Sequence, residues 1–227
     1  AFAAHVIKAR HGVVTFTHPL LASALYGDLT PGERERAHGL LAKVVDDPLA
    51  RARHLALAAS APDAGVAAAV EEAAASAAGQ AANVAAAELA VHAVRLTPSD
   101  DEDARHRREV TAVRMHLLAG DAARARVEGE GLLRRPLSPR QRADVLLVLS
   151  DIADTGSQAR ANALRKEALA GAVSDAAMQA SIHTWLAGRV RTTEGLTAAE
   201  AHARTALELA ERLDDDGLRA GALSALS

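Results

Sequence analysis

Histidine is the residue type with the greatest chemical potential in this chain, which holds ten histidines and no cysteine. A histidine metal site needs several ligands on one face at short spacing, as in H-E-x-x-H, and this sequence contains no such motif. His106 and His116 are ten residues apart, so on one helix they would point to different faces. We therefore expect no metal site and interpret the histidines as surface or interhelical residues.

Two acidic runs could be mistaken for cation sites. Ser99 precedes the run 100–103, and a second run spans residues 214–216. Both are typical of helix N-termini, with Ser99 as the cap of the first, because the helix dipole favours acidic residues there. The arginines that follow the first run could contact phosphate, but a solvated face paired with these acids is the simpler interpretation; they are Arg105, Arg107 and Arg108.

No pattern in the chain supports catalysis or nucleotide binding. The sequence has no nucleophile elbow, no singled-out pair of carboxylates and no G-x-x-x-x-G-K-[ST] phosphate loop. We therefore expect neither an enzyme nor a cofactor within these residues.

The single tryptophan marks the best candidate for a binding surface. Trp185 lies on a helix expected to line the inner face of a helical array, where it could form part of a ligand or peptide pocket. A core position is the simpler alternative, because Met178, Ile182 and Trp185 share an i, i+4, i+7 stripe. The candidate ligand or partner residues are Trp185, His183, Arg189, Met115 and His116.

The candidate residues lie on helices of a hairpin that repeats along the chain. Small residues followed by an apolar residue recur at steps of 37 or 38 residues, at Ala93, Gly131, Ala168 and Ala206. A fixed period of this length predicts a stacked array of two-helix units. We expect the four small residues where the paired helices cross most closely. The expected pairs are 63–79 with 81–96, 100–119 with 121–134, 139–154 with 157–172 and 175–190 with 197–213, followed by a helix at 215–227.

Composition also favours an all-α fold, because 49% of residues are apolar, mostly alanine, and only 2% are aromatic. The expected architecture is a right-handed superhelical array of αα-hairpins of tetratricopeptide type. Residues 1–17 should form a β-hairpin that belongs to a domain lying mostly upstream, 18–62 linking helices, and 63–227 the repeats, cut short at the C-terminus. In the linking part we expect a helix ended by Gly27. A second helix should follow the Thr30–Glu33 capping box and place Ala37, Leu40, Leu41, Val44 and Val45 on one face.

Several stretches of the sequence match one family pattern, chiefly Phe16–Tyr26, Leu29–Arg34 and 50–59, continued by 86–90, 96–98, 116–125 and 206–213. In these stretches the sequence resembles the large ATP-binding LuxR-family transcription regulators of actinobacteria. The resemblance implies that an ATPase module precedes this segment, that residues 1–17 are the tail of a winged helix, and that a helix-turn-helix follows the repeats. ATP and DNA binding would then belong to the missing modules, and this segment would sense an effector or partner and control the ATPase.

We therefore expect a regulatory helical-repeat domain whose partners are its own ATPase module and an effector or protein. The alternative is a self-standing scaffold that binds a peptide or protein on its concave face. A net charge of −3 gives no basic face for nucleic acid, and no apolar run of 18 residues or signal peptide is present, so we expect a cytoplasmic segment. The uncovered last helix, with Leu218, Leu223 and Leu226, should favour homo-oligomers.

Overall fold

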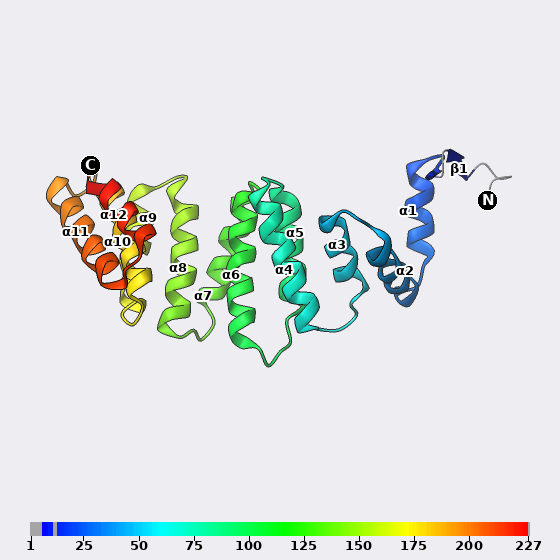
Figure 1. Cartoon of the computed structure of the whole chain (residues 1–227), viewed down its shortest axis with the longest axis horizontal. Helices are drawn as coiled ribbons and strands as arrows, with labels where there is room; N and C mark the ends of the chain where they lie inside the picture. Colours follow the sequence, from blue (N-terminus) through cyan, green and yellow to red (C-terminus); the bar gives the residue numbers. More distant parts are fainter. Residues whose placement is uncertain (1–5, 11–12, 227) are drawn as a thin grey trace.

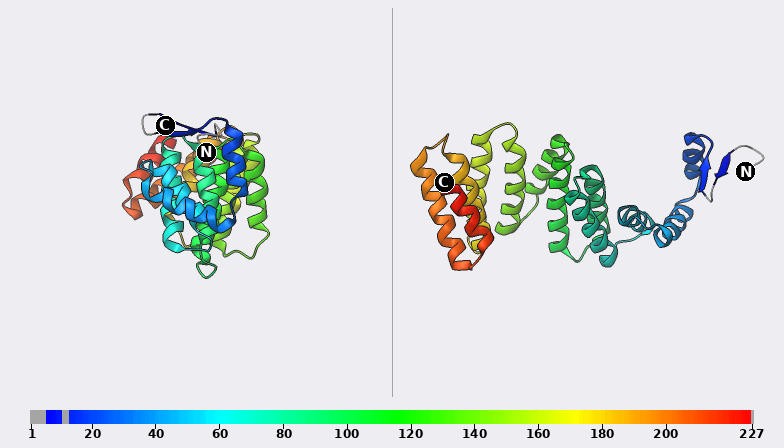
Figure 2. Two further views of the ribbon diagram at one scale, coloured as in Figure 1. Left: turned by 90° about the vertical axis from the view of Figure 1, so that its right-hand side faces the viewer. Right: turned by 45° about the horizontal axis from the view of Figure 1, so that its top comes forward.

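The computed structural model describes residues 6–10 and 13–226, which form twelve helices and one two-stranded sheet. The helices pack as consecutive antiparallel hairpins in a long row, with the N-terminal sheet at one end and the C-terminal hairpin at the other (Figures 1 and 2). The predicted all-α fold with a short N-terminal hairpin is confirmed at this level.

The N-terminal sheet pairs β1 (Ile7–Arg10) with β2 (Val13–Phe16) in antiparallel register, with Ile7 opposite Phe16. Residues 11 and 12 of the expected turn lie outside the described residues. Helix α1 (Pro19–Asp28) follows, and the prediction that Gly27 ends it is wrong, since it continues to Asp28. One glycine near a helix end costs too little to stop the helix before its C-cap at Leu29.

Helix α2 (Pro31–Val44) begins at the predicted capping box, in which Thr30 and Glu33 bond each other reciprocally. The apolar face predicted for this helix is not the face that is buried. Leu40 and Val44 are 65% and 72% exposed, whereas His38 and Ala42 are buried. The side of α2 that meets α3 (Pro48–Ala58) is the one that carries His38, whose ring bonds the His54 ring. The periodicity identified an apolar stripe, but the neighbouring helix selected the other side.

The four predicted hairpins are all present. They pair α4 (Ala64–Gly79) with α5 (Asn83–Leu96), α6 (Glu102–Leu118) with α7 (Ala122–Leu133), α8 (Pro139–Asp154) with α9 (Gln158–Gly171), and α10 (Ala176–Val190) with α11 (Leu196–Leu213). Side-chain oxygens cap most of these helices, which satisfies N–H groups that would otherwise lack partners. The predicted cap at Ser99 is wrong: Asp101 caps α6 and accepts from the Ala104 amide at 3.0 Å.

The core consists of two apolar clusters that meet at α6. Ala112 belongs to the cluster built by α3 to α6, and the adjacent Val113 belongs to the cluster that continues through α11. Consecutive residues on α6 therefore pack into different clusters. The hairpins on either side of α6 both bury apolar residues against it, which is how stacked repeats complete their cores.

The small residues of the repeat behave unequally. Ala93, Ala168 and Ala206 are at most 1% exposed, but Gly131 is only half-buried, and a Cβ there would meet nothing closer than Arg134 Nη2 at 3.6 Å. The prediction of a close approach at Gly131 is therefore wrong. The tight contact lies at Gly129, where a Cβ would come within 2.8 Å of Leu149 Cδ2.

Helix α12 (Asp216–Leu226) begins after Asp215, which caps it through the Leu218 amide. Leu218 is half-buried and Leu223 is 51% exposed, as predicted, while the Leu226 side chain lies outside the described part. Self-association through this helix remains a prediction. None of the helices in the described ranges is long and apolar enough to cross a membrane.

Candidate functional site

Trp185 lies on the surface of α10 and is 49% exposed, so the interpretation of this residue as a core anchor is wrong. Its neighbours Ile182 and Leu186 are buried, at 1% and 0% exposure. Trp185 stands at the edge of the apolar stripe, and the packing of α10 covers Ile182 and Leu186 while leaving the indole in solvent. An exposed indole with a polar edge is common on contact surfaces.

Two arginines lie against the Trp185 ring. The guanidinium carbons of Arg165, on α9, and Arg189, one turn further along α10, are 4.9 Å and 5.3 Å from a ring centroid. Cations at this distance from an aromatic face are attracted by its quadrupole. Two guanidinium groups therefore contact the indole although it faces solvent.

Arg165 is itself buried, at 1% exposure, and is neutralised by acids from the end of α8. It donates to Asp154 at 2.7 Å and 3.2 Å and to Asp151 at 3.3 Å. The hydrogen bond from Arg165 lowers the pKa of Asp154, whereas burial raises the pKa of Asp151 against the opposing charges of Arg114 and Arg165. We call Trp185, Arg189, Arg165, Asp151 and Asp154 the Trp185 patch, which joins α8, α9 and α10.

His183 is engaged elsewhere. Its Nδ1 lies 2.8 Å from Nδ1 of His202 on α11, and the ring centroids are 5.0 Å apart. Burial is the main cause that lowers the pKa of both rings, and His202 lowers that of His183 further. His183 therefore links the two helices of the last repeat hairpin through one shared hydrogen bond.

This histidine pair predicts a loss of stability in acid. A histidine whose pKa is lowered by folding contributes stability above its usual pKa of 6.5, and that stability is lost as pH falls through the lower folded-state value. We expect the free energy of unfolding to decline below about pH 6.5. The decline should be shallower in His202→Gln, measured by urea titrations at pH 7.5 and 5.5. An equal decline in that variant would contradict a role for the pair.

Met115 and His116 do not join the Trp185 patch. Met115 packs against the core cluster of α3 to α6. His116 is buried beside a groove of about 400 Å³ between α5 and α7, with its Nε2 3.5 Å from Glu128 Oε2 and without a hydrogen-bond partner. The five candidate residues thus fall into three separate places: Trp185 with Arg189, His183 with His202, and the α5–α7 side of α6.

The arginines after the first acidic run also differ from expectation. Arg108 is 6% exposed and donates to Glu71 on α4 and to Thr97, each at 2.8 Å. Arg105 donates to the Thr97 carbonyl at 2.9 Å, so Arg107 alone of the three remains fully on the surface. The prediction of one solvated face is wrong because the end of α5 offers buried oxygens that need donors.

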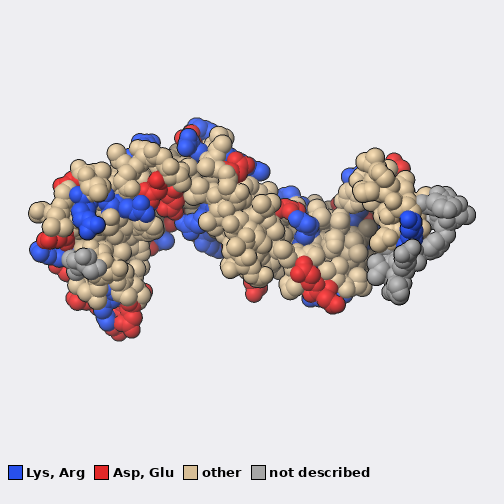
Figure 3. All heavy atoms as spheres, turned by 90° about the horizontal axis from the view of Figure 1, so that it is seen from above, with Lys and Arg blue, Asp and Glu red and all other residues tan. Residues whose placement is uncertain are grey.

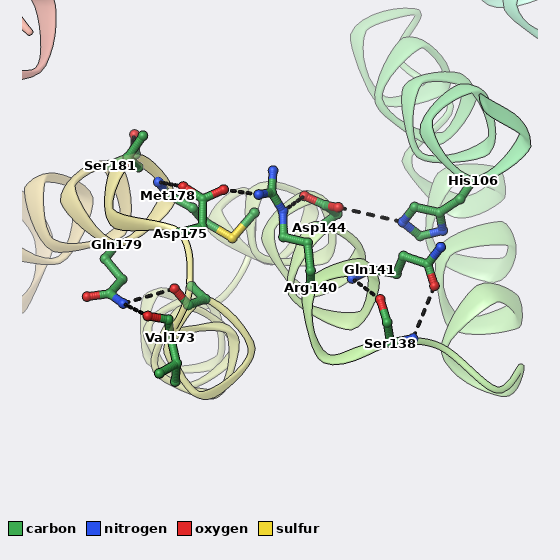
Figure 4. Close-up of polar contacts among 12 residues, drawn as sticks. His106, Ser138, Arg140, Gln141, Asp144, Val173, Asp175, Met178, Gln179 and Ser181 are labelled. Carbon is green, nitrogen blue, oxygen red and sulfur yellow. Dashed lines mark hydrogen bonds and ion pairs between the residues drawn. The ribbon is translucent and has the colours of Figure 1, made fainter. Parts of the chain in front are cut away.

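A second polar cluster joins the N-terminal ends of α6, α8 and α10 (Figure 4). Arg140 bonds Asp144 at 3.4 Å and also Asp175, which caps α10 by accepting from the Met178 amide. Asp144 in turn lies 3.7 Å from His106 Nε2. The cluster therefore links three successive hairpins at the ends opposite to the Trp185 patch.

Arg165, Asp151 and Asp154 were not predicted as site residues. Arg165 is adjacent to the buried Leu164, and Asp151 and Asp154 are three residues apart on one helix face, which is the only local signal. Comparisons with family models, with curated proteins and with solved structures found no match for this chain. On the face shown in Figure 3, acidic and basic side chains are interspersed rather than gathered into one large patch of a single sign.

Proposed function

We propose that this chain is a regulatory and protein-interaction segment of tetratricopeptide type. It belongs, on this proposal, to a LuxR-family ATP-dependent transcription regulator and is arranged as a right-handed array of hairpins. The resemblance of residues 16–59 suggests the family, and the stacked hairpins are compatible with it. ATP and DNA would be bound by other modules of that regulator.

The observation that carries an interaction role is the Trp185 patch. An exposed indole lies against two arginines, and the buried one, Arg165, is neutralised by Asp154 and the partly exposed Asp151, so the position of the indole is set before any partner arrives. Tryptophan and arginine are the residues most enriched among energetic hot spots of interfaces. A preorganised surface loses little side-chain entropy on binding.

The proposal identifies the patch as a contact surface for an effector or for another module of the regulator. Arg189 has a half-exposed guanidinium, and Arg114 beside Asp151 is exposed, so the surface around the indole offers cations to an acidic or aromatic group. A regulator could use such a contact to favour one arrangement of its modules over another, provided that the contact differs between the two arrangements.

Replacing Trp185 by alanine should weaken binding of the effector or module about 30-fold or more, equivalent to about 2 kcal/mol, without unfolding the chain. Trp185 emission would be titrated with candidate metabolites and with the purified flanking modules, and calorimetry would compare wild type with Trp185→Ala. Leu223→Ala, an exposed apolar change on α12, is the control. A partner that binds both chains equally would contradict the proposal.

The self-standing scaffold remains the second candidate. A second groove between α5 and α7, next to the one beside His116 and lined by Val91, Val94 and Leu132, is the observation that favours it, since apolar grooves between helices accept amphipathic segments. The full gene sequence distinguishes the two candidate functions, because the regulator requires a phosphate loop upstream of this segment and a helix-turn-helix downstream of it.

A further inference from the structure

A cavity of about 340 Å³ lies between the start of α6 and the connection from α7 to α8. Its size falls within the range of about 300–1,000 Å³ that is usual for small-molecule sites. Its polar lining consists of Ser99, Glu102, Arg105, His106, Arg135 and Gln141. It is separate from the Trp185 patch, because Gln141 is in the first turn of α8 and Asp154 is the last residue of that helix, about 20 Å away.

His106 is the group in this cavity that most needs a partner. It is 4% exposed, and neither Nδ1 nor Nε2 has a hydrogen-bond partner among the described residues. Asp144 Oδ2, at 3.7 Å from Nε2, is too distant for a hydrogen bond. A buried polar group without a partner is costly, and a neutral imidazole offers one donor and one acceptor. Figure 4 places the ring beside the Gln141 side chain.

The charged groups around His106 are of both signs. Arg105 uses one Nη on the Thr97 carbonyl, and Arg135 uses one Nη on Glu109 at 2.6 Å. Each guanidinium has five N–H donors, so both keep donors for a carboxylate. Glu102 makes no ion pair with any described residue and supplies a carboxylate on the same lining.

This combination selects a particular class of ligand. A simple anion would be attracted by the arginines but repelled by Glu102. A simple cation would be attracted by Glu102 but repelled by the arginines. A metal ion would need more ligands than the lining offers, since no group of three or more histidine and acidic residues in the described ranges could hold one. A ligand with charges of both signs satisfies the arginines and Glu102 together.

We propose that this cavity binds a small metabolite that carries both a carboxylate and an amino group, that is, a free amino acid or a close relative. Its carboxylate bonds Arg105 and Arg135, its ammonium bonds Glu102, and its polar groups exchange hydrogen bonds with His106 and Gln141. The site goes beyond the proposed function, because it assigns a ligand to a part of the array outside the Trp185 patch.

The test begins with the purified chain and the twenty common L-amino acids. Thermal unfolding identifies ligands, and side-chain ¹H–¹⁵N NMR follows the two ring nitrogens of His106. At least one amino acid should raise the melting temperature and shift the His106 signals saturably. If no amino acid shifts them, the proposal is overturned.

Matched probes then separate the two charges. The acid without the amino group and the amine without the carboxylate should each bind about tenfold or more weakly than the intact amino acid. Glu102→Gln should abolish the preference for the amino acid over the deaminated acid, because it removes both the partner of the ammonium and the repulsion of a bare carboxylate, whereas Asp100→Asn should change neither affinity. Equal binding of the deaminated acid and the amino acid to wild type would overturn the proposal.

Exposed arginines give the last control. Arg135→Ala should weaken the amino acid about tenfold or more, and Arg134→Ala, which removes the neighbouring exposed arginine outside the lining, should not. Both variants change surface side chains, so both should fold. Equal affinities in the two variants would show attraction to surface charge in general and would overturn the site. The test does not involve Trp185, so it can fail independently of the proposed function.

Discussion

Replacing Arg165 by methionine is expected to lower the free energy of unfolding by about 3 kcal/mol, the largest loss from any single polar substitution in this chain. Arg165 is 1% exposed and bonds Asp154 and Asp151, whose side chains are 15% and 39% exposed. Methionine keeps much of the volume but leaves both carboxylates without the guanidinium. Because Asp151 is partly solvated, we expect the lower end of the range of about 3–5 kcal/mol for broken buried pairs.

Urea titration of the variant, followed by circular dichroism, measures this loss. Arg160→Met, on the exposed side of the same helix, is the control and should change stability by less than about 0.5 kcal/mol. The triple variant Arg165→Met, Asp151→Asn, Asp154→Asn should recover part of the loss, since it removes the uncompensated charges. If Arg165→Met were as stable as Arg160→Met, the network would not hold α8, α9 and α10 together.

The second large effect is expected at Gly171, the last residue of α9. A Cβ there would lie 2.1 Å from the carbonyl oxygen of Pro139 and 3.1 Å from Ala143 Cβ, both at the start of α8. The nearest obstacle is backbone and cannot rotate away. We therefore expect Gly171→Ala to destabilise the protein by about 3 kcal/mol, although alanine is the better helix former.

Gly131→Ala is the matched control for this substitution. Gly131 lies within α7, and a Cβ there would meet only the end of a flexible arginine at 3.6 Å, so the helix propensity of alanine should raise stability by about 0.5–1 kcal/mol. Thermal melts of the two variants should therefore shift in opposite directions. A stabilising Gly171→Ala would show that α8 can move away from α9 at little cost.

The helices themselves were predictable from the sequence. The eight helices of the four predicted hairpins begin and end within a few residues of the expected bounds, because capping residues such as Asp121, Ser138 and Asp175 act within one turn of chain. The errors at Gly27 and Ser99 arose where a glycine or a second acidic residue offered a competing local signal. Local chemistry fixes such elements, since the relevant hydrogen bonds join residues three or four positions apart.

The candidate site was predictable only in part. Trp185 was singled out because the chain has no other tryptophan, but its exposure could not be read from an apolar stripe that serves a core and a surface equally well. Arg165 was missed because the acids that it bonds are 11 and 14 residues away on another helix. The cavity around His106 likewise joins two separate stretches of the chain, 99–106 and 135–141.

The sequence by itself determined the helices, their caps and the alternation of hairpins, because these depend on contacts between residues close together in the chain. The tertiary structure alone decided which side of α2 is buried, that Gly129 and Gly171 rather than Gly131 are the tight contacts, and that Trp185 faces solvent over Arg165. The physical reason is that a helix stripe has several possible partners, and the one that covers it is chosen by the shape and charge of residues distant in sequence.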